Sequence, residues 1–372
     1  MTEAREMHRR LLTLDTHLDA PVHFARADWS FGDRHDLATD VAQMDLPRME
    51  DGNLSGGFFV IYTEQGPLAA DAYAIAHAAM RTRADEIDAM LAAFPNRIGA
   101  ATTADEVRRL HTEGRLIALR SIENSYFLGA DLAGLAEFYA RGVRLAGPVH
   151  ARSNQLADSA TDTPLWQGLS PLGRDWVAEM NRLGMVIDAS HASDAAFDAM
   201  LARSATPLLL SHSGSRTVYD SPRNLDDDRL RALAATGGVI CFATIFLSDL
   251  KLSLERRELF NLHGRIGELD AAAQRDLAWR WNALETTDPM WQAGFDDYIT
   301  GLLHVIAVAG IDHVGFGADW DGGGGIPNLA DITDYPRVTE ALLDHGLSEA
   351  ELVKLWSGNV LRVLEAAERH AG

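Results

Sequence analysis

Cysteine, lysine and long apolar runs are scarce in this sequence, and each scarcity excludes a class of protein. The single cysteine, Cys241, cannot form an intrachain disulfide, which excludes the disulfide frameworks of small secreted domains. It lies in an apolar run, so we expect a buried, unreactive thiol. No stretch of roughly 20 apolar residues is present, so we expect no membrane-spanning helix.

Basic residues are also few relative to acidic ones. The 372 residues include 54 acidic and 33 basic side chains, which gives a formal net charge of -21. A surface of this sign repels nucleic acid and anionic membranes, so neither is an expected partner. The first ten residues are polar and lack the apolar core of a signal peptide, and we therefore expect a soluble, cytoplasmic protein.

What the sequence does contain is a repeated alternation of short apolar runs and helical stretches. Most of the runs are continuously apolar, as expected for parallel strands that are covered on both faces. Eight runs are found, at residues 12–19, 57–62, 116–123, 143–150, 185–191, 207–212, 238–244 and 313–319. This alternation predicts an α/β fold, a TIM-like (β/α)8 barrel, and residues 1–372 are predicted to form one such domain.

Two long connections depart from a minimal barrel, around residues 30–56 and 245–294. The second contains Trp279, Trp281 and Trp291. It could cover the active site, form a subunit contact or be a peripheral decoration, and the sequence leaves these alternatives open.

Ionisable residues recur at the predicted carboxyl ends of the strands. His17 and Asp19 end the first strand two residues apart, so both side chains are expected to point to the same side. Five further strands end in a residue of this kind, namely Glu123, His150, His191, His212 and Asp319. In barrels of this type, the carboxyl ends of the strands form the active-site face. Imidazole and carboxylate groups are suitable zinc ligands, so the set predicts a metal site.

The scarcity of lysine bears on how two metal ions would be joined. Many barrel hydrolases bridge two ions with a carboxylated lysine. Here the two lysines, Lys251 and Lys354, do not end a predicted strand. Glu123 is the acidic strand-end residue in the middle of the barrel, so it is predicted to be the bridging ligand.

Several short motifs, in this order along the chain, are similar to those of one family of metal hydrolases. They are Asp15-Thr16-His17-Leu18-Asp19-Ala20-Pro21, Gly56-Gly57-Phe58-Phe59, Ser121-Ile122-Glu123, His150 with Asn154, Asn181-Arg182-Leu183-Gly184, Ile187-Asp188-Ala189-Ser190-His191, Ser211-His212-Ser213, Pro222-Arg223-Asn224 and Gly315-Phe316-Gly317-Ala318-Asp319-Trp320-Asp321-Gly322. The sequence resembles the membrane (renal) dipeptidase family, peptidase family M19 of the amidohydrolase superfamily. The similarity spans nearly the whole chain.

The resemblance implies a metal-dependent dipeptidase with two zinc ions per chain. One ion would be bound by His17, Asp19 and Glu123, and the other by Glu123, His191 and His212. The family hydrolyses dipeptides, often with a D-residue at the C-terminal position, so a small dipeptide is the expected substrate. The family also makes a homodimer the expected state of the chain.

The resemblance further implies that His150, Arg223 and Asp319 contact the substrate. His150 would stabilise the developing oxyanion, and Arg223 would bind the terminal carboxylate of the dipeptide. Asp319 would carry a proton from the attacking water to the leaving nitrogen. Asp321 would point the same way as Asp319, so the choice between the two carboxylates stays open. Helix capping or a surface ion pair is the alternative role for Arg223.

The sequence departs from the family pattern beside two of these residues. Asn124 and Ser125 replace the usual glycines after Glu123, and residues 146–149 replace a threonine-rich run before His150. Both changes flank the pocket, so they affect the expected substrate preference and not the metal site.

Two other functions stay open from the sequence. One is a different amidohydrolase-type enzyme, such as a lactonase, a deaminase or a phosphotriesterase-like hydrolase. The missing bridging lysine and the presence of Arg223 argue against most of these. The other is a non-catalytic metal-binding barrel, which would be expected to have lost some of the five ligands, whereas all five are present.

Overall fold

The computed structural model describes residues 3–250 and 252–371. Its centre is a set of parallel strands that are hydrogen-bonded in the orders β1-β2-β4-β5-β6 and β7-β8-β9. Isolated bridges between Asp188 and Leu209 and between Leu18 and Trp320 join the two groups at both seams. These bridges complete a barrel of β1 (Leu14–Leu18), β2 (Gly56–Tyr62), β4 (Leu116–Glu123), β5 (Val143–Ala146), β6 (Val186–Ile187), β7 (Leu209–Ser213), β8 (Val239–Phe242) and β9 (Val314–Phe316).

The predicted fold class is confirmed, and each of the eight predicted strands coincides with a strand of the barrel. Several strands are shorter than predicted. The run at 143–150 ends as β5 at Ala146, because Pro148 has no amide hydrogen to donate to a neighbouring strand. The strand β3 (Ile98–Ala100), which was not predicted, pairs with the first half of β4. Its three residues are too few for an apolar pattern to be recognised.

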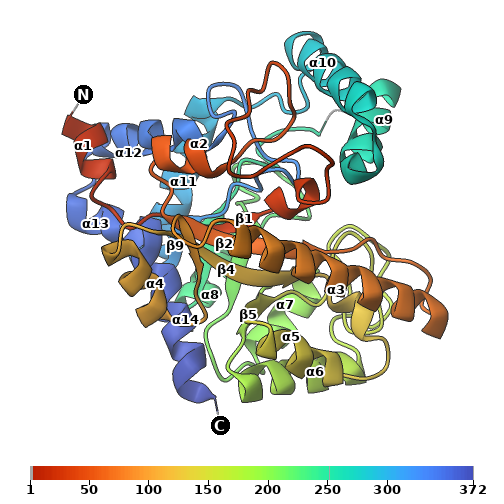
Figure 1. The fold of residues 1–372 in the computed structure, drawn as a ribbon. Helices are drawn as coiled ribbons and strands as arrows, with labels where there is room; N and C mark the ends of the chain where they lie inside the picture. Colours follow the sequence, from red (N-terminus) through yellow and green to blue (C-terminus); the bar gives the residue numbers. More distant parts are fainter. Residues whose placement is uncertain (1–2, 251, 372) are drawn as a thin grey trace.

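Helices surround the strands (Figure 1). In α6 (Pro171–Leu183), the Ser170 hydroxyl accepts a hydrogen bond from the N–H of Gly173, and Gly184 ends the helix at a φ of 74°. No described helix combines the length and the apolar character that a membrane crossing requires. The remaining helices are α1 (Glu3–His8), α2 (Leu46–Asp51), α3 (Ala70–Ala93), α4 (Ala104–Thr112), α5 (Ala133–Ala140), α7 (Asp194–Leu201), α8 (Asp227–Ala235), α9 (Leu254–His263), α10 (Ala271–Thr287), α11 (Phe295–Ala309), α12 (Tyr335–Asp344), α13 (Glu349–Val353) and α14 (Asn359–His370).

The barrel strands are buried on both faces, as their continuous apolar sequence predicts. In β2, the neighbouring residues Phe58 and Phe59 point to opposite faces and belong to different hydrophobic clusters. Cys241 of β8 is fully buried, and burial raises the pKa of its thiol. The cysteine is therefore part of the core, as expected from its apolar neighbours.

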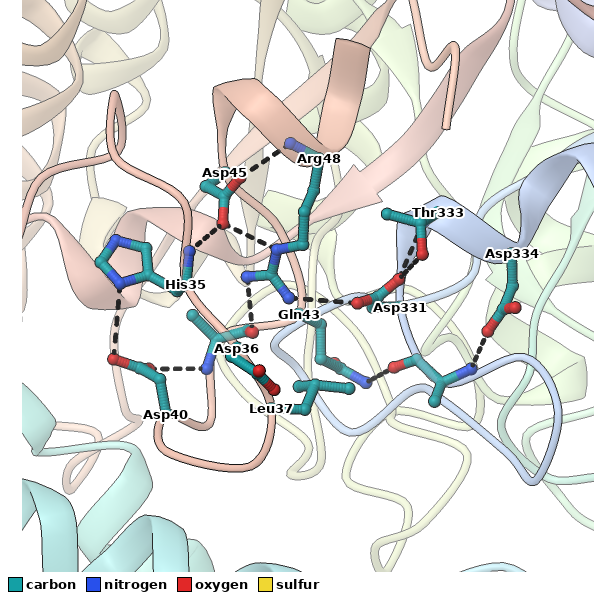
Figure 2. Close-up of polar contacts among 12 residues, drawn as sticks. His35, Asp36, Leu37, Asp40, Gln43, Asp45, Arg48, Asp331, Thr333 and Asp334 are labelled. Carbon is teal, nitrogen blue, oxygen red and sulfur yellow. Dashed lines mark hydrogen bonds and ion pairs between the residues drawn. The ribbon is translucent and has the colours of Figure 1, made fainter. Parts of the chain in front are cut away.

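The connection between β1 and β2, which includes the predicted insertion at residues 30–56, folds against the loop that follows β9 (Figure 2). Asp45 begins α2 by accepting a hydrogen bond from the backbone N–H of Arg48. The Arg48 guanidinium in turn donates to the carboxylates of Asp45, at 2.7 Å, and of Asp331, at 3.2 Å. Only 2% of Arg48 is exposed, so water screens these ion pairs little. These ion pairs hold residues 30–56, called the first insertion below, over one side of the barrel mouth.

The predicted insertion at residues 245–294 contains a helical hairpin of α9 and α10, which projects from the barrel at the upper right of Figure 1. The fully buried Arg256 joins the two helices by donating to the Glu285 carboxylate at 2.7 Å. Leu254 and Trp279 are 89% and 70% exposed. The hairpin packs on the first insertion through a small hydrophobic cluster of its own, made of Val41, Leu259, Ile266, Leu277 and Ala278.

Candidate metal centre

The five predicted metal ligands lie together at the carboxyl end of the barrel strands. Three of them lie within strands, namely His17 in β1, Glu123 in β4 and His212 in β7. Asp19 and His191 lie in the loops directly after β1 and β6, which are shorter than predicted. The parallel ladders place all these ends at one edge, so residues far apart in sequence meet there.

The Glu123 carboxylate stands at the centre of the group. Nε2 of His17 lies 3.7 Å from Glu123 Oε1 and 3.3 Å from Asp19 Oδ2. Nε2 of His191 and Nε2 of His212 lie 2.8 and 3.5 Å from the same Glu123 oxygen. One carboxylate oxygen is therefore close to three imidazoles, which is the central position expected of a shared ligand.

These distances fit ligand atoms that surround divalent ions. Ligand atoms that surround a tetrahedral zinc ion at about 2.0–2.1 Å lie roughly 3.3 Å from one another. The separations from the Glu123 oxygen, 2.8 to 3.7 Å, bracket this value. Nε2 of His17 is buried and has no hydrogen-bond partner among the described residues. The donor set, with its imidazoles and carboxylates, is also the type that zinc prefers.

The electrostatics of the cluster favour a cation. Burial raises the pKa of the Glu123 and Asp319 carboxyl groups well above the usual range. Burial alone lowers the pKa of His17, but the charges of Asp19 and Glu123 outweigh it and raise the pKa to about 10. The site therefore holds on to a proton at this position, and a divalent ion would meet the same demand for positive charge.

The other histidines of the site have the opposite shift. Burial is the main cause that lowers the pKa of His191 and His212 well below the usual value, so both rings are neutral and offer a lone pair. Burial and the positive charge of Arg223 also lower the pKa of His150. The side chain of His150 is still 31% exposed, so it faces the open mouth of the barrel.

The loop after β9 places Asp319 and Asp321 in different surroundings. The sequence left open which of these two carboxylates would carry the proton. Oδ1 of Asp319 lies 3.6 Å from Nε2 of His17, inside the cluster. Oδ1 of Asp321 instead lies 3.2 Å from Nε2 of His23 and accepts from the backbone N–H of Gln43 at 2.7 Å. The expectation that the two would point the same way is wrong, because both residues have positive φ, 69° and 66°, and the alternation of an extended strand does not apply.

Gly322 allows the same loop to approach the metal ligands. A Cβ atom at this position would lie 2.1 Å from Oδ2 of Asp19 and 2.4 Å from Oδ1 of Asp319. Any other residue would displace these carboxylates, so the glycine is required by the close approach of the backbone to the site.

A second cluster of metal-binding residue types lies beside the first and consists of His23, His263 and Asp321. The Arg26 guanidinium lies 3.3 Å from Nδ1 of His23 and donates to it. The ring proton of His23 is therefore on Nε2, which donates to Asp321 and has no lone pair for a metal. We interpret this cluster as a support for the loops. His263 comes from α9, and the sequence analysis missed it because it does not follow a strand.

Arg223 lies in the loop after β7 and is 3% exposed. Its Nη2 lies 3.4 Å from the carbonyl oxygen of His212, whereas its Nε and Nη1 have no partner among the described residues. Burial lowers the pKa of the guanidinium to about 10, so it is still charged at neutral pH. It neither caps a described helix nor forms a surface ion pair with a described residue, which removes the two alternative roles considered from the sequence.

His150 lies in the loop after β5 and points toward the same centre. Its Nε2 is 3.9 Å from Glu123 Oε1, and its Nδ1 is 3.4 Å from the hydroxyl of Tyr62. Tyr62, the last residue of β2, was not among the predicted site residues. A search for strands that end in His, Asp or Glu does not find it, although its position at the end of a barrel strand is the same signal.

Buried polar residues to which the sequence analysis gave no role lie behind the histidines. They include Asp188, Ser190 and Ser211, each at most 5% exposed. Ser211 Oγ lies 3.2 Å from Nδ1 of His17 and 2.8 Å from Nδ1 of His212. All three precede a histidine of the predicted metal site by one or three residues, and this spacing is the signal that could have found them.

Comparisons with known proteins agree with this geometry. Residues 1–372 match the family model described as membrane dipeptidase (peptidase family M19). Among named relatives, the chain is similar to dipeptidase tcpJ of Claviceps purpurea, with 32% identity over 356 residues, which are 93% of this chain and 75% of that protein.

Solved structures show the same similarity. The probable dipeptidase PvdM from Pseudomonas aeruginosa is 30% identical, with a TM-score of 0.84 over 99% of this chain and 98% of that chain. A metallopeptidase from Rhodobacter sphaeroides is 28% identical, with a TM-score of 0.75 over 96% of this chain and 99% of that chain. The second structure is liganded with a phosphinate mimic of the dipeptide L-Ala-D-Ala.

Proposed function

Because this chain belongs to the membrane dipeptidase family, peptidase family M19, and is a metal-dependent dipeptidase, we propose that it hydrolyses dipeptides with two zinc ions. The observation that carries the proposal is the central position of Glu123, whose Oε1 lies within 3.7 Å of Nε2 of His17, His191 and His212. One ion would be held by His17, Asp19 and Glu123, and the other by Glu123, His191 and His212. Asp19 completes the first set through its contact with His17.

His150 is positioned to stabilise negative charge on the scissile carbonyl oxygen. When bound, two zinc ions supply the Lewis acidity that polarises a carbonyl group and makes water more acidic. The Tyr62 hydroxyl can donate to Nδ1 of His150, at 3.4 Å, which leaves the N–H on Nε2 facing the centre. A neutral imidazole with this tautomer donates a hydrogen bond without bringing a full charge, and oxyanion donors of this kind contribute strongly to amide hydrolysis.

Asp319 is proposed to move the proton. Its Oδ1 lies 3.6 Å from Nε2 of His17, at the centre of the site, and burial raises its pKa. A carboxyl group with a raised pKa can take a proton from the attacking water and return it to the leaving nitrogen. Asp321 is held away from the centre by His23 and Gln43, so the proton transfer is assigned to Asp319 alone.

Arg223 is proposed to bind the C-terminal carboxylate of the dipeptide. Two of its nitrogens are buried without a partner among the described residues, which leaves a charged, planar donor available for an anion. Phe246 packs on the guanidinium, with the ring centre 5.4 Å from the guanidinium carbon, and fixes its plane. A free carboxylate distinguishes a dipeptide from an internal peptide bond, so this contact supports a dipeptidase specificity.

The substrates are proposed to include dipeptides with a D-residue at the C-terminal position. The Rhodobacter sphaeroides relative, whose structure holds a mimic of L-Ala-D-Ala, supports this part of the proposal. Asn124 and Ser125, which the sequence places beside the bridging glutamate, are both buried, so their effect on the preference would act through the shape of the loop.

Metal removal and a substrate panel test the proposal together. Purified protein is expected to contain about two zinc ions per chain, to lose activity on chelation and to regain it with zinc. Dipeptides with L- and D-residues at both positions are set against lactones, nucleobases and phosphotriesters, and hydrolysis is expected for dipeptides alone. Unchanged turnover after verified metal removal would reject the metal mechanism, and a metal-loaded protein that is inert to every dipeptide would reject the substrate.

A homodimer and a cytoplasmic location stay predictions. The exposed side chains of Leu254 and Trp279 on the α9–α10 hairpin support a subunit contact there, and sedimentation at several concentrations tests it. The free thiol of Cys241 supports a reducing compartment, which cell fractionation tests.

A further inference from the structure

The hydroxyl of Ser211 stands between two histidines that belong to different metal groups. Its Oγ lies 3.2 Å from Nδ1 of His17, on β1, and 2.8 Å from Nδ1 of His212, on β7. The same oxygen lies 2.5 Å from Oδ2 of Asp188. Ser211 is fully buried and Asp188 is 5% exposed, so water does not compete for these contacts.

The number of donors and acceptors fixes the direction of each hydrogen bond. A serine hydroxyl has one hydrogen and two lone pairs, and a carboxylate only accepts. Oδ1 of Asp188 already accepts from the backbone N–H groups of Ser190 and Ser211, both at 3.0 Å, and from the Ser190 hydroxyl at 2.6 Å. Since three donors already converge on Oδ1, the Asp188 side chain acts as an acceptor here, and its Oδ2 takes the hydroxyl hydrogen of Ser211.

It follows that both lone pairs of Ser211 Oγ accept from imidazole N–H groups. His17 and His212 must then carry hydrogen on Nδ1 and a lone pair on Nε2 when they bind metal. Nε2 of His17 and Nε2 of His212 lie 3.7 and 3.5 Å from Oε1 of Glu123, the proposed bridging oxygen. His191 differs, because its buried Nδ1 has no hydrogen-bond partner among the described residues.

We infer that Ser211, anchored by Asp188, is a positioning residue that fixes the metal-binding tautomer of His17 and His212 together and thereby couples the two metal positions. The inference deepens the proposed function and rests on its two-ion site. A metal-binding imidazole usually donates its other N–H to a partner behind it, and this one hydroxyl is that partner for a ligand in each proposed group. Loss of this single hydroxyl should therefore weaken the binding of both ions.

Ser211→Ala tests the inference through metal affinity. Competition with a chromophoric zinc chelator gives separate dissociation constants for the two ions, without any need for activity. Both constants are expected to rise about 10- to 100-fold, the usual effect of losing a partner behind a metal ligand. Ser121→Ala is the matched control, since Ser121 is also a buried serine of a barrel strand but its hydroxyl has no hydrogen-bond partner among the described residues, and its constants are expected to change less than about threefold.

A spectroscopic measurement separates positioning from a general loss of structure. In zinc-loaded protein labelled with ¹⁵N-histidine, the Nδ1 protons of His17 and His212 are expected to exchange slowly with water. In Ser211→Ala these protons lose their acceptor and should exchange faster. The ring proton of His8, which is buried against Thr339 and does not contact Ser211, should keep its exchange rate.

Asp188→Asn provides a second variant that keeps the size of the side chain. Its amide oxygen would occupy the Oδ1 position, where three donors converge, so its NH₂ group would face Ser211. The amide then donates to Ser211 Oγ and forces the hydroxyl hydrogen toward an imidazole. Weaker binding of both ions is again expected. This variant therefore tests the inference independently of Ser211→Ala, including the case in which Ser211→Ala does not fold.

The outcomes distinguish the inference from the proposed function. A wild-type protein that binds fewer than two zinc ions would overturn the two-ion function itself. A wild-type protein with two ions, whose constants change for one ion only in both variants, would overturn the coupling alone. Unchanged constants and unchanged Nδ1 exchange in both variants would remove Ser211 from any positioning role.

Discussion

The carboxyl ends of the barrel strands and the α9–α10 hairpin are built in opposite ways. At the strand ends, ionisable side chains are buried and surrounded by hydrogen bonds, as the contacts of Asp188 with Ser190 and Ser211 illustrate. In the hairpin, large apolar side chains such as Leu254 and Trp279 are exposed, and its hydrophobic cluster is separate from the clusters of the barrel. The strand ends therefore bury polar groups, whereas the hairpin exposes apolar ones.

This difference indicates that the strand ends are more rigid than the hairpin. A strand end is fixed by ladders on both sides and by side-chain hydrogen bonds, so the positions of the ligands tolerate little change. The hairpin and its flanking segments contact the rest of the chain through the connection between β1 and β2, where Arg26 donates to Gln274 at 3.0 Å, and through a few further polar contacts, such as the Trp291 indole N–H to the carbonyl of Gly323 at 2.8 Å. We therefore expect changes at the strand ends to alter catalysis, and changes in the hairpin to alter local stability.

The largest expected effect is that of Arg223→Met at the strand ends. For free dipeptides, kcat/KM should fall about 100- to 1000-fold, mainly through KM, because a buried charged partner of the substrate carboxylate is worth roughly 3–4 kcal/mol. Dipeptides with an amidated C-terminus should lose far less. Steady-state kinetics on the two substrate series measures the difference, and the zinc content should stay unchanged.

Arg216→Met is the matched control for this substitution. Arg216 lies on the same loop, but it is partly exposed and pairs with Asp194 at 2.6 Å. Its loss should change kcat/KM by less than about threefold for either series. An equal loss for free and amidated dipeptides in Arg223→Met would contradict the carboxylate-binding role.

Arg256→Met tests the other side of the comparison. Arg256 donates to Glu285 at 2.7 Å and to the Asp288 carbonyl at 2.8 Å, and it lies over the ring of Trp281. Its loss should lower the local stability of the hairpin by about 3 kcal/mol, because buried hydrogen bonds of a charged group are broken. Hydrogen exchange should accelerate within residues 254–287 and not at the strand ends.

The control for the hairpin is its neighbour Arg257, which is exposed. Arg257→Met should change stability by less than about 0.5 kcal/mol. Loss of zinc from Arg256→Met, or faster exchange that extends to β4 and β7, would show that the hairpin and the metal centre form one cooperative unit and would break the comparison.

The smallest expected effect concerns His8, a buried group outside both regions. It contacts Thr339 Oγ1 at 2.7 Å and the Gly52 carbonyl at 3.0 Å, and burial lowers its pKa from 6.5 to about 4. The unfolded chain therefore binds a proton between pH 6.5 and 4 that the folded chain does not. The contribution of His8 to the free energy of unfolding is therefore complete above pH 6.5 and is lost as the pH falls toward 4.

His8→Gln should remove this dependence. Between pH 7.5 and pH 5, the free energy of unfolding of the wild type should fall by about 2 kcal/mol more than that of the variant. Urea unfolding at both values measures the difference. Parallel losses in the two proteins would show that His8 does not respond to pH in this way.

The strand ends could be predicted from the sequence because two periodic signals coincide there. The eight apolar runs define the strands, and four of the predicted runs end in Glu123, His150, His191 and His212. The direction of Asp321 could not be predicted in the same way. Its positive φ breaks the alternation of an extended strand, and the contacts that hold it come from a distant loop.

Neither could the hairpin be placed, because no periodic pattern relates it to the barrel. Its cluster depends on Val41, more than 200 residues earlier in the chain, and contacts over such separations leave no trace in local composition. His263 and its neighbour His23 meet for the same reason, and only the three-dimensional packing shows that Arg26 directs the proton of His23 to Asp321.

By itself, the sequence determined the number and order of the barrel strands and the residue types at their ends, because burial on both faces and the direction of parallel strands are local and repetitive requirements. Only the tertiary structure decided which carboxylate faces the candidate metal centre, and that Ser211 contacts Nδ1 of both His17 and His212, which are proposed to bind different ions. These depend on the angles of single side chains and on hydrogen bonds between distant strands, which are set when the barrel closes.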